Sequence, residues 1–206
     1  MTVVKAKVQN ADLVKKKHKK IVGVAGGLFS KQGFHKTSMR QIAEASGTEL
    51  SYLYKYISSK HDILLLLYES LYERYSSILD VIEKKPEQDP AEQLIEVIEL
   101  FFETSQGYYP ETRATLMETR HLTKEHFKIV LQKEIEYANA FLKLIERGNK
   151  SGCFDVKDPL VSANFVVHMI EADIIRGWAY RKKRTPEEAK AEMIRFILQA
   201  LGCCKC

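Results

Sequence analysis

The chain has 206 residues, of which 45% are hydrophobic and 29% are charged, the ordinary composition of a globular protein with one or two domains. No run approaches the roughly 18 apolar residues that span a bilayer, and no signal-peptide pattern is present, so we expect no membrane segment and a cytoplasmic location. The net charge of +5 divides into 12 Lys/Arg against 3 Asp/Glu in residues 1–60 (+9) and 20 against 24 in residues 61–206 (−4). A basic head on a mildly acidic body is expected of a nucleic-acid-binding module, because each phosphate contact releases counterions.

The N-terminal segment combines a polar lead with an amphipathic helix. Residues 1–11 contain too little apolar material to fold alone and are predicted to form a mobile arm. Residues 12–33 carry apolar side chains at helical spacing, after a basic run from Lys15 to Lys20. This run is either a solvated surface or a source of non-specific attraction for phosphates.

The next stretch holds two short amphipathic segments joined by a tight turn. Ser38 and Gln41 form a predicted capping box, so a helix begins there. Gly47 follows its last turn, where a left-handed residue ends a helix at little steric cost. Thr48 is predicted to cap a second helix, roughly residues 49–55. Two helices joined by a short turn that contains Gly make a helix-turn-helix, whose second helix enters the DNA major groove.

Signature positions of one known domain are filled across about 45 residues: Ile21, Val24, Ala25, Leu28, Phe29, Gly33, Phe34, Thr37, Ser38, Met39, Arg40, Ile42, Ala43, Ala45, Gly47, Leu53, Tyr54, Tyr56, Ser59 and Lys60. With these residues the segment resembles the N-terminal domain of the tetracycline-repressor (TetR) family. It departs from the family pattern at Glu49, at Ile57 and at three glycines inside the first helix, Gly23, Gly26 and Gly27. Each interior glycine costs about 0.5–1 kcal/mol relative to Ala, so we expect this helix to depend on packing.

The resemblance assigns roles to residues of the motif. It places Leu50, Ser51 and Tyr52 against base edges, where a hydroxyl can donate or accept and an apolar group can meet a thymine methyl. Phosphate oxygens suit a second group, made of Thr37, Ser38, Tyr54, Lys55, Tyr56 and Lys60. Arg40 could serve either role. For the tyrosines, packing between the basic head and the body is the alternative.

Six further helices are predicted, and no segment shows strand alternation. Their ranges are about 60–84, 89–107, 111–121, 123–148, 158–178 and 185–201. Prolines directly after Asp89, Asp158 and Thr185 mark three of the starts. The fold class is therefore all-α, with about nine helices in total. We predict a DNA-binding domain at residues 12–60 and an effector-binding and dimerisation domain at residues 61–202.

The cysteines gather at the C-terminal end. Cys203, Cys204 and Cys206 lie within the last four residues, and Cys153 stands alone, without the second pair or the His that a zinc site needs. We therefore predict a flexible, reduced end at residues 203–206, with a redox or metal role as the alternative. No metal site and no cofactor are expected.

The body is predicted to pair with a second copy and to bind a small molecule. A helix-turn-helix reads half a site, so a palindromic operator calls for a dimer, and the last two helices carry the apolar material for a four-helix interface. The alternative is that both helices pack inside one chain. Apolar and aromatic residues with a few polar groups line the predicted effector pocket. The candidates are Tyr68, Tyr72, Phe101, Phe102, Ser105, Met117, His121, Tyr137 and Phe141, and an ordinary core role is the alternative for each.

Three functions compete for this body. With residues such as Glu118, Arg120 and Phe154, the C-terminal portion resembles repressors that sense acyl-CoA thioesters. A basic cluster from Arg176 to Arg184 could meet the phosphates of CoA. The rival is a multidrug-efflux regulator that binds lipophilic cations with its aromatics and Glu171 or Asp173. A helical enzyme acting on acyl thioesters is disfavoured, since the histidines lie scattered without a Ser or Cys partner pattern. We predict a sequence-specific transcriptional repressor that a small lipophilic effector releases from its operator, with no catalytic residues.

Overall fold

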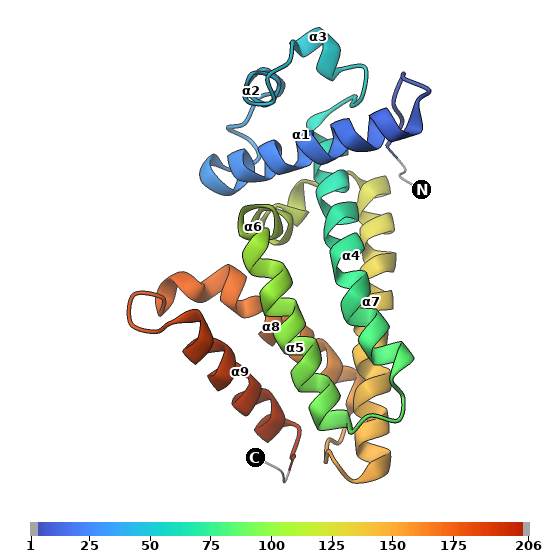
Figure 1. Cartoon of the computed structure of the whole chain (residues 1–206), viewed down its shortest axis with the longest axis vertical. Helices are drawn as coiled ribbons and strands as arrows, with labels where there is room; N and C mark the ends of the chain where they lie inside the picture. The colour runs from blue at the N-terminus through green and yellow to red at the C-terminus, as the bar shows by residue number, and fades with distance from the viewer. Residues whose placement is uncertain (1–3, 204–206) are drawn as a thin grey trace. The chain divides into compact units, whose positions relative to one another are not determined.

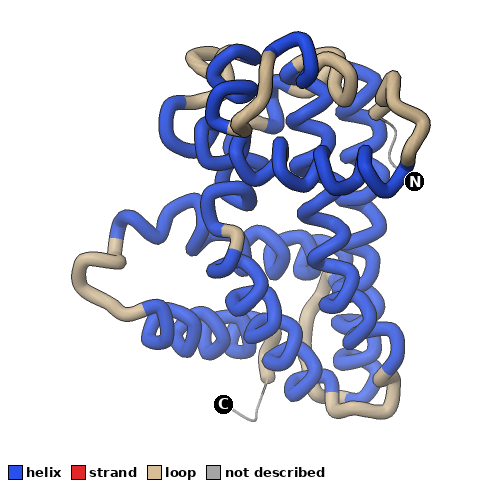
Figure 2. The backbone as a smooth tube through the Cα atoms, turned by 45° about the horizontal axis from the view of Figure 1, so that its top comes forward, coloured by secondary structure: helices blue, strands red, loops and turns tan. Residues whose placement is uncertain are grey.

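The computed structural model describes residues 4–203, and within that range nine α-helices and two short 3-10 helices are joined by loops, with no strand (Figures 1 and 2). The elements are α1 (Ala11–Gln32), α2 (Met39–Ala45), α3 (Leu50–Leu53), α4 (Lys60–Lys84), α5 (Pro90–Gly107), α6 (Tyr109–Met117), η1 (Thr119–His121), α7 (Lys124–Ser151), α8 (Pro159–Arg176), η2 (Gly177–Ala179) and α9 (Pro186–Ala200). The predicted all-α fold is confirmed. None of the helices in this range is long and apolar enough to cross a membrane.

Local chemistry fixes most helix starts. Ser38 caps α2 in a complete capping box, because its hydroxyl accepts from the Gln41 amide at 3.2 Å while the Gln41 side chain accepts from the Ser38 amide at 2.8 Å. Thr185 and Glu188 form the same arrangement at α9. The predicted cap at Thr48 is wrong, since its amide donates to the Ala43 carbonyl at 3.0 Å within the turn. The second helix of the motif is therefore shorter than expected, and Glu49 precedes it without a side-chain cap.

The chain divides into two compact units. The first comprises Met1–Arg74 and Tyr108–Leu131, and the second comprises Tyr75–Gly107 and Gln132–Cys206. The predicted domain boundary after residue 60 stays a prediction. In the structure, the first part of α4 and all of α6 belong to the same compact unit as the helix-turn-helix.

In the first unit, α6 packs closely on the middle of α1 (Figure 1). A Cβ atom added at Gly26 would lie 2.7 Å from Cγ and 3.0 Å from Cα of Glu111, so no larger residue fits without a shift. A Cβ at Gly23 would sit 3.6 Å from the Glu111 carboxylate, while one at Gly27 would meet nothing within 4 Å. Glycine at position 26 costs the helix some stability, but its lack of a side chain allows α6 to approach α1 this closely.

Parts of the predicted flexible ends are packed. Val4 is buried in the core of the first unit, and the Lys7 amide donates to the Lys55 carbonyl at 2.8 Å. Cys203 is buried too, and its amide donates to the Leu198 carbonyl at 3.0 Å. Residues 1–3 and 204–206, at the outer tips of these predicted ends, lie outside the described residues.

The second unit is built around α5, which packs with α8 and α9. Its buried face includes Leu94, Val97, Ile98 and the pair Phe101 and Phe102. Gln93 is buried as well, and its amide nitrogen donates to the carbonyls of Val81 at 2.7 Å and Lys85 at 3.0 Å, while its oxygen accepts from Arg147. A buried amide with partners on both ends fixes the start of α5, because leaving either end unpaired would be costly.

Candidate nucleic-acid interface

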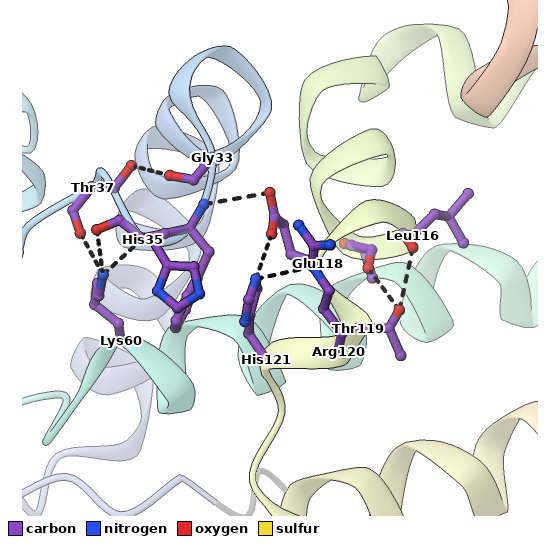
Figure 3. A network of polar contacts seen from close by, with 11 residues as sticks. Gly33, His35, Thr37, Lys60, Leu116, Glu118, Thr119, Arg120 and His121 are labelled. Atoms are coloured by element: carbon purple, nitrogen blue, oxygen red, sulfur yellow. Dashed lines mark hydrogen bonds and ion pairs between the residues drawn. The ribbon is translucent and has the colours of Figure 1, made fainter.

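The loop between α1 and α2 is held from inside the protein by Lys60 (Figure 3). The Lys60 ammonium donates to the backbone carbonyls of Thr37 at 2.6 Å and Phe34 at 2.7 Å, and it lies 4.5 Å from the centroid of the Phe34 ring. Partial burial lowers the pKa of Lys60 below its ordinary value. Lys60 is predicted from the sequence to contact DNA phosphates, whereas in the structure its ammonium donates to the loop backbone.

Thr37 and Tyr56 were also predicted to contact phosphates, and both are buried. The Thr37 hydroxyl donates to the Gly33 carbonyl at 2.9 Å and accepts from the Gln32 side chain at 3.1 Å. Tyr56 is 2% exposed, and its carbonyl contacts the His18 ring nitrogen at 2.9 Å. These contacts position the motif from inside the protein, and a phosphate contact by either residue stays a prediction.

Tyr52 is held in place by its neighbours. Its hydroxyl hydrogen-bonds with that of Tyr56 at 2.9 Å, and the ammonium groups of Lys17 and Lys55 lie 5.2 Å and 5.3 Å from its ring centroid. Cation–π contacts of this kind stabilise the ring where it lies. The hydrogen bond with Tyr52 raises the pKa of Tyr56, and burial raises it further, so the Tyr56 phenol stays neutral at physiological pH. Tyr52 is therefore packed against other residues of the DNA-binding segment and remains half-exposed, and its contact with base edges stays a prediction.

The exposed members of the predicted set lie on α2, on α3 and in the turn that follows. Ser38, Arg40, Ser51, Tyr54 and Lys55 are exposed, and Leu50 is half-buried against the core. This is a mixed set of hydroxyl, cationic and aromatic groups, which suits both phosphates and base edges. We call these six residues the recognition face.

Two lysines of the basic run flank this motif. Lys17 and Lys20 line a small cavity together with Ser46 and Thr48 of the turn, and the Lys20 ammonium lies 3.9 Å from where a Gly47 Cβ would stand. Their spacing of three residues puts both on one side of α1. The basic run is visible in the sequence, but the sequence does not show which of its lysines lie beside the turn.

Lys55→Ala is expected to weaken binding to every duplex by a similar factor and to reduce the slope of log affinity against log salt by about 1, because it removes the predicted phosphate contact of an exposed lysine that follows α3. Fluorescence anisotropy across a salt series measures the slope. Lys143→Ala, which removes an equally exposed lysine from α7 in the second unit, is the matched control and should leave it unchanged. An unchanged slope for Lys55→Ala would remove this residue from the interface.

A cluster of rings lies beside the same loop. The His121 ring stacks on Phe34 with centroids 5.0 Å apart and meets the His35 ring edge-on at 4.2 Å (Figure 3). Its Nε2 accepts from the Arg120 guanidinium at 3.2 Å and lies 3.3 Å from the Glu118 carboxylate, whose other oxygen accepts from the Phe34 amide at 3.4 Å. Burial lowers the pKa of His121, and the charges of His35, Arg120 and His61 lower it further against the opposing effect of Glu118.

Acidification is expected to destabilise the protein through His121. The unfolded chain takes up a proton near the ordinary pKa of 6.5, whereas the folded state keeps His121 neutral to lower pH, so the free energy of unfolding falls as the pH drops below about 6.5. His121→Gln should lessen this loss. Urea denaturation of both proteins at about pH 7.5 and pH 5.5 measures it; equal pH dependence in the two proteins would contradict the assignment.

Five of the predicted effector residues come together in the second unit. Phe101, Tyr137 and Phe141 are buried around Tyr75, whose ring centroid lies 5.1 Å from that of Phe101 and 5.5 Å from that of Tyr137. Phe102 adjoins Phe101 at 6.3 Å, and the Ser105 hydroxyl lies 3.5 Å from that of Tyr75. Burial raises the pKa of Tyr137, so its phenol is neutral. Tyr75 is the member of this cluster that the sequence analysis missed, although it follows Tyr68 and Tyr72 along the same helix.

The other four predicted effector residues lie in the first unit and do not form one cluster there. Tyr68 is buried with its hydroxyl bonded to Thr119, and the Tyr72 ring adjoins it at 6.3 Å. Met117 is 44% exposed, and His121 belongs to the ring cluster described above. Whether any of these four meets an effector stays a prediction.

The chain matches two known family models. Residues 21–67 match the model described as bacterial regulatory proteins, tetR family, which covers the second half of α1, α2, α3 and the start of α4. Residues 87–201, more than half of the chain, match the model described as tetracyclin repressor-like, C-terminal domain.

Individual proteins resemble the chain more distantly. The HTH-type transcriptional regulator HbdR of Aromatoleum sp. (strain CIB) is 33% identical over 72 residues, which is 35% of this chain and only about a third (31%) of HbdR. A tetR-family regulatory protein from Rhodococcus RHA1 superposes with a TM-score of 0.80 over 92% of this chain and 99% of its own, at 21% identity. FadR from Bacillus subtilis in complex with stearoyl-CoA superposes with a TM-score of 0.73 over 87% of this chain and 97% of its own, at 19% identity. At these identities the superpositions show a shared fold.

Proposed function

We propose a function that starts from one premise: this chain belongs to the TetR family, and it is a DNA-binding transcriptional regulator, not an enzyme. It binds operator DNA through its helix-turn-helix. The function we propose is repression, in which a small lipophilic effector releases a dimer from a palindromic operator in the cytoplasm. The observation that carries this proposal is the exposed recognition face on a basic N-terminal segment, held from within by Lys60.

The surface of α8 and α9 supports a dimer. Phe165 on α8 is 64% exposed and Phe196 on α9 is 57% exposed, with Leu160 and Val161 also exposed at the start of α8. Met169, Ala172, Met193 and Phe196 belong to the lining of a groove of about 1000 Å³ between the two helices. Large apolar side chains that one chain leaves in water are typical of a surface that a partner covers. A second copy supplies the same face, and two recognition helices then meet successive major grooves.

Phe165→Asp is expected to shift the protein from dimer to monomer, because a carboxylate at the centre of an apolar interface is desolvated without a partner. Sedimentation equilibrium measures the mass. Phe127→Asp is the matched control, since Phe127 is also exposed, at 46%, but lies on α7. A variant at position 165 that still sediments as a dimer would exclude this face.

The aromatic cluster around Tyr75 supports a lipophilic effector in the second unit. Phe101, Phe102, Tyr137 and Phe141 supply apolar surface, and Ser105 with the neutral Tyr137 phenol supplies polar groups that can orient a ligand. Among acyl-CoA thioesters, stearoyl-CoA is bound by the FadR of similar fold. Lys182, Lys183 and Arg184 are exposed and available for CoA phosphates, whereas Arg181 already pairs with Asp173 at 2.5 Å.

The rival cationic effector has less support. The Asp173 carboxylate accepts from the Tyr180 hydroxyl at 2.6 Å as well as from Arg181, so its charge is already balanced. The Glu171 carboxylate lies 3.7 Å from the His168 ring, and this contact raises the pKa of His168, which favours the charged imidazolium. A lipophilic cation would have to displace these partners.

Release from a labelled operator tests the effector. Titration with a long-chain acyl-CoA should release the DNA, while free CoA and tetraphenylphosphonium should not, because only the thioester combines an acyl chain with phosphates. Release by the cation alone would favour the multidrug-type regulator. An unchanged acyl-CoA in the final mixture, seen by mass spectrometry, agrees with a sensor that binds its ligand without turnover.

A further inference from the structure

The end of α9 packs against the loop between α7 and α8 in the second unit. The Asp155 amide donates to the Leu201 carbonyl at 2.9 Å, which joins the two segments by their backbones. Gly202 has a left-handed φ of 70°, and a Cβ added there would lie 3.1 Å from the Asp155 Cβ and 3.2 Å from its carbonyl oxygen. The two segments therefore approach at backbone contact distance, where glycine avoids both a crowded Cβ and the strain of a left-handed φ.

This contact brings two thiols together that are fifty residues apart in the sequence. Cys153 lies two residues before Asp155 and Cys203 lies two residues after Leu201, so the backbone contact brings the two free cysteines to the same place. Each is anchored by its own backbone, since the Cys153 amide donates to Gly148 at 2.9 Å and the Cys203 amide donates to Leu198 at 3.0 Å. Cys153 is half-buried and Cys203 is buried, so a small reagent reaches the first more easily.

We propose that Cys153 and Cys203 form a modification site, in which a peroxide converts the two thiols into an intramolecular disulfide. The Cys153 thiolate attacks the peroxide, its sulfur gains an oxygen as the O–O bond breaks, and water leaves. The Cys203 sulfur then attacks this sulfenic acid, the S–S bond forms, and a second water leaves. The balance is two thiols and one hydrogen peroxide to one disulfide and two waters.

The surroundings of the pair set the rate of the first step. Burial raises the pKa of Cys153, and the Asp89 carboxylate and Cys203 raise it further against a hydrogen bond with the Ala91 backbone, which lowers it. The thiolate is the attacking species, so oxidation is slow at neutral pH and becomes faster as the pH rises. The resulting cross-link closes a loop that contains both α8 and α9.

The test uses the full chain carrying Cys204→Ser and Cys206→Ser, which leaves only this pair. After exposure to hydrogen peroxide we expect both thiols to be lost to titration, one cross-linked peptide joining residues 153 and 203 in the mass spectrum, and full recovery with dithiothreitol. The oxidised form should melt about 5 °C or more above the reduced form, because a cross-link restricts the unfolded chain. The initial rate should rise with pH.

The test measures thiols and cross-linked peptides, so its result does not depend on DNA binding. Adding Cys153→Ser to the double variant should leave Cys203 reduced under the same exposure, because the buried thiol depends on its neighbour for oxidation. Two thiols that both persist in the folded protein, while the urea-unfolded chain oxidises in a parallel reaction, would overturn the proposal. So would cross-links between chains, or separate sulfinic acids without an intramolecular disulfide.

Discussion

Gly26→Ala is expected to destabilise the protein by about 1–3 kcal/mol, against the usual direction of a Gly-to-Ala change inside a helix. The reason is the crossing of α1 by α6, where the new methyl group would meet Glu111 at 2.7 Å from Cγ and 3.0 Å from Cα. A side-chain atom could swing aside, but the Cα belongs to the α6 backbone, so the helices must separate. Urea denaturation followed by circular dichroism measures the change in the free energy of unfolding.

Gly27→Ala is the matched control for that change. The two residues are neighbours on α1 with the same intrinsic preference, yet a Cβ at Gly27 would meet nothing within 4 Å. The control should therefore stabilise the protein by about 0.5–1 kcal/mol, since it removes the entropic cost of a helical glycine without a clash. Two variants that shift the stability in the same direction would contradict the packing described for α1 and α6.

Lys60→Met is expected to destabilise the loop between α1 and α2 and to lower the unfolding free energy by about 1–3 kcal/mol. Methionine keeps most of the apolar stem but removes the ammonium that donates to Thr37 at 2.6 Å and to Phe34 at 2.7 Å. The affinity for DNA should fall with the order of the loop, because the loop positions α2 and its capping box. The slope of log affinity against log salt should stay as in the parent protein, since no phosphate contact is lost.

This slope separates the two roles of Lys60. If its ammonium bound a phosphate, the slope would decrease by about 1 and the stability would change little. Lys36→Met is the control for the stability measurement, because Lys36 lies in the same loop but is exposed. A stability loss as large for Lys36 as for Lys60 would remove the assigned role of the Lys60 hydrogen bonds.

The elements of this fold follow from local chemistry that a sequence displays. The capping box at Ser38, the helix start at Thr185, the left-handed Gly47 and the apolar spacing of α1 each involve residues within one or two helical turns, and all are found as predicted. The predicted cap at Thr48 is wrong because α3 begins one residue later, after Glu49, while the Thr48 amide bonds to the Ala43 carbonyl within the turn. The propensity of Thr for a cap position does not show where the turn ends.

The candidate site was harder to predict, because several of its residues are defined by contacts distant in the sequence. Lys60 has the charge of a phosphate ligand, and only the fold places it beside the carbonyls of residues 34 and 37. His121 lies more than eighty residues after Phe34, on which it stacks. From the sequence, Gly26 is expected only to weaken α1, and only the fold shows that Glu111 of α6 packs against it. Sequence patterns report which groups are present, and long-range packing determines which of them remain free to bind DNA.

The central claim is that two copies of the recognition face read a two-fold symmetric DNA site. In-vitro selection from a random duplex library at physiological salt, followed by footprinting of the selected DNA, tests it most directly. We predict an inverted repeat with two protected half-sites about one helical turn or a multiple of it apart, bound by two chains, and loss of enrichment with a Ser51→Asp variant. Enrichment of no sequence over random duplex, or of a site bound by a single chain without symmetry, would contradict the account.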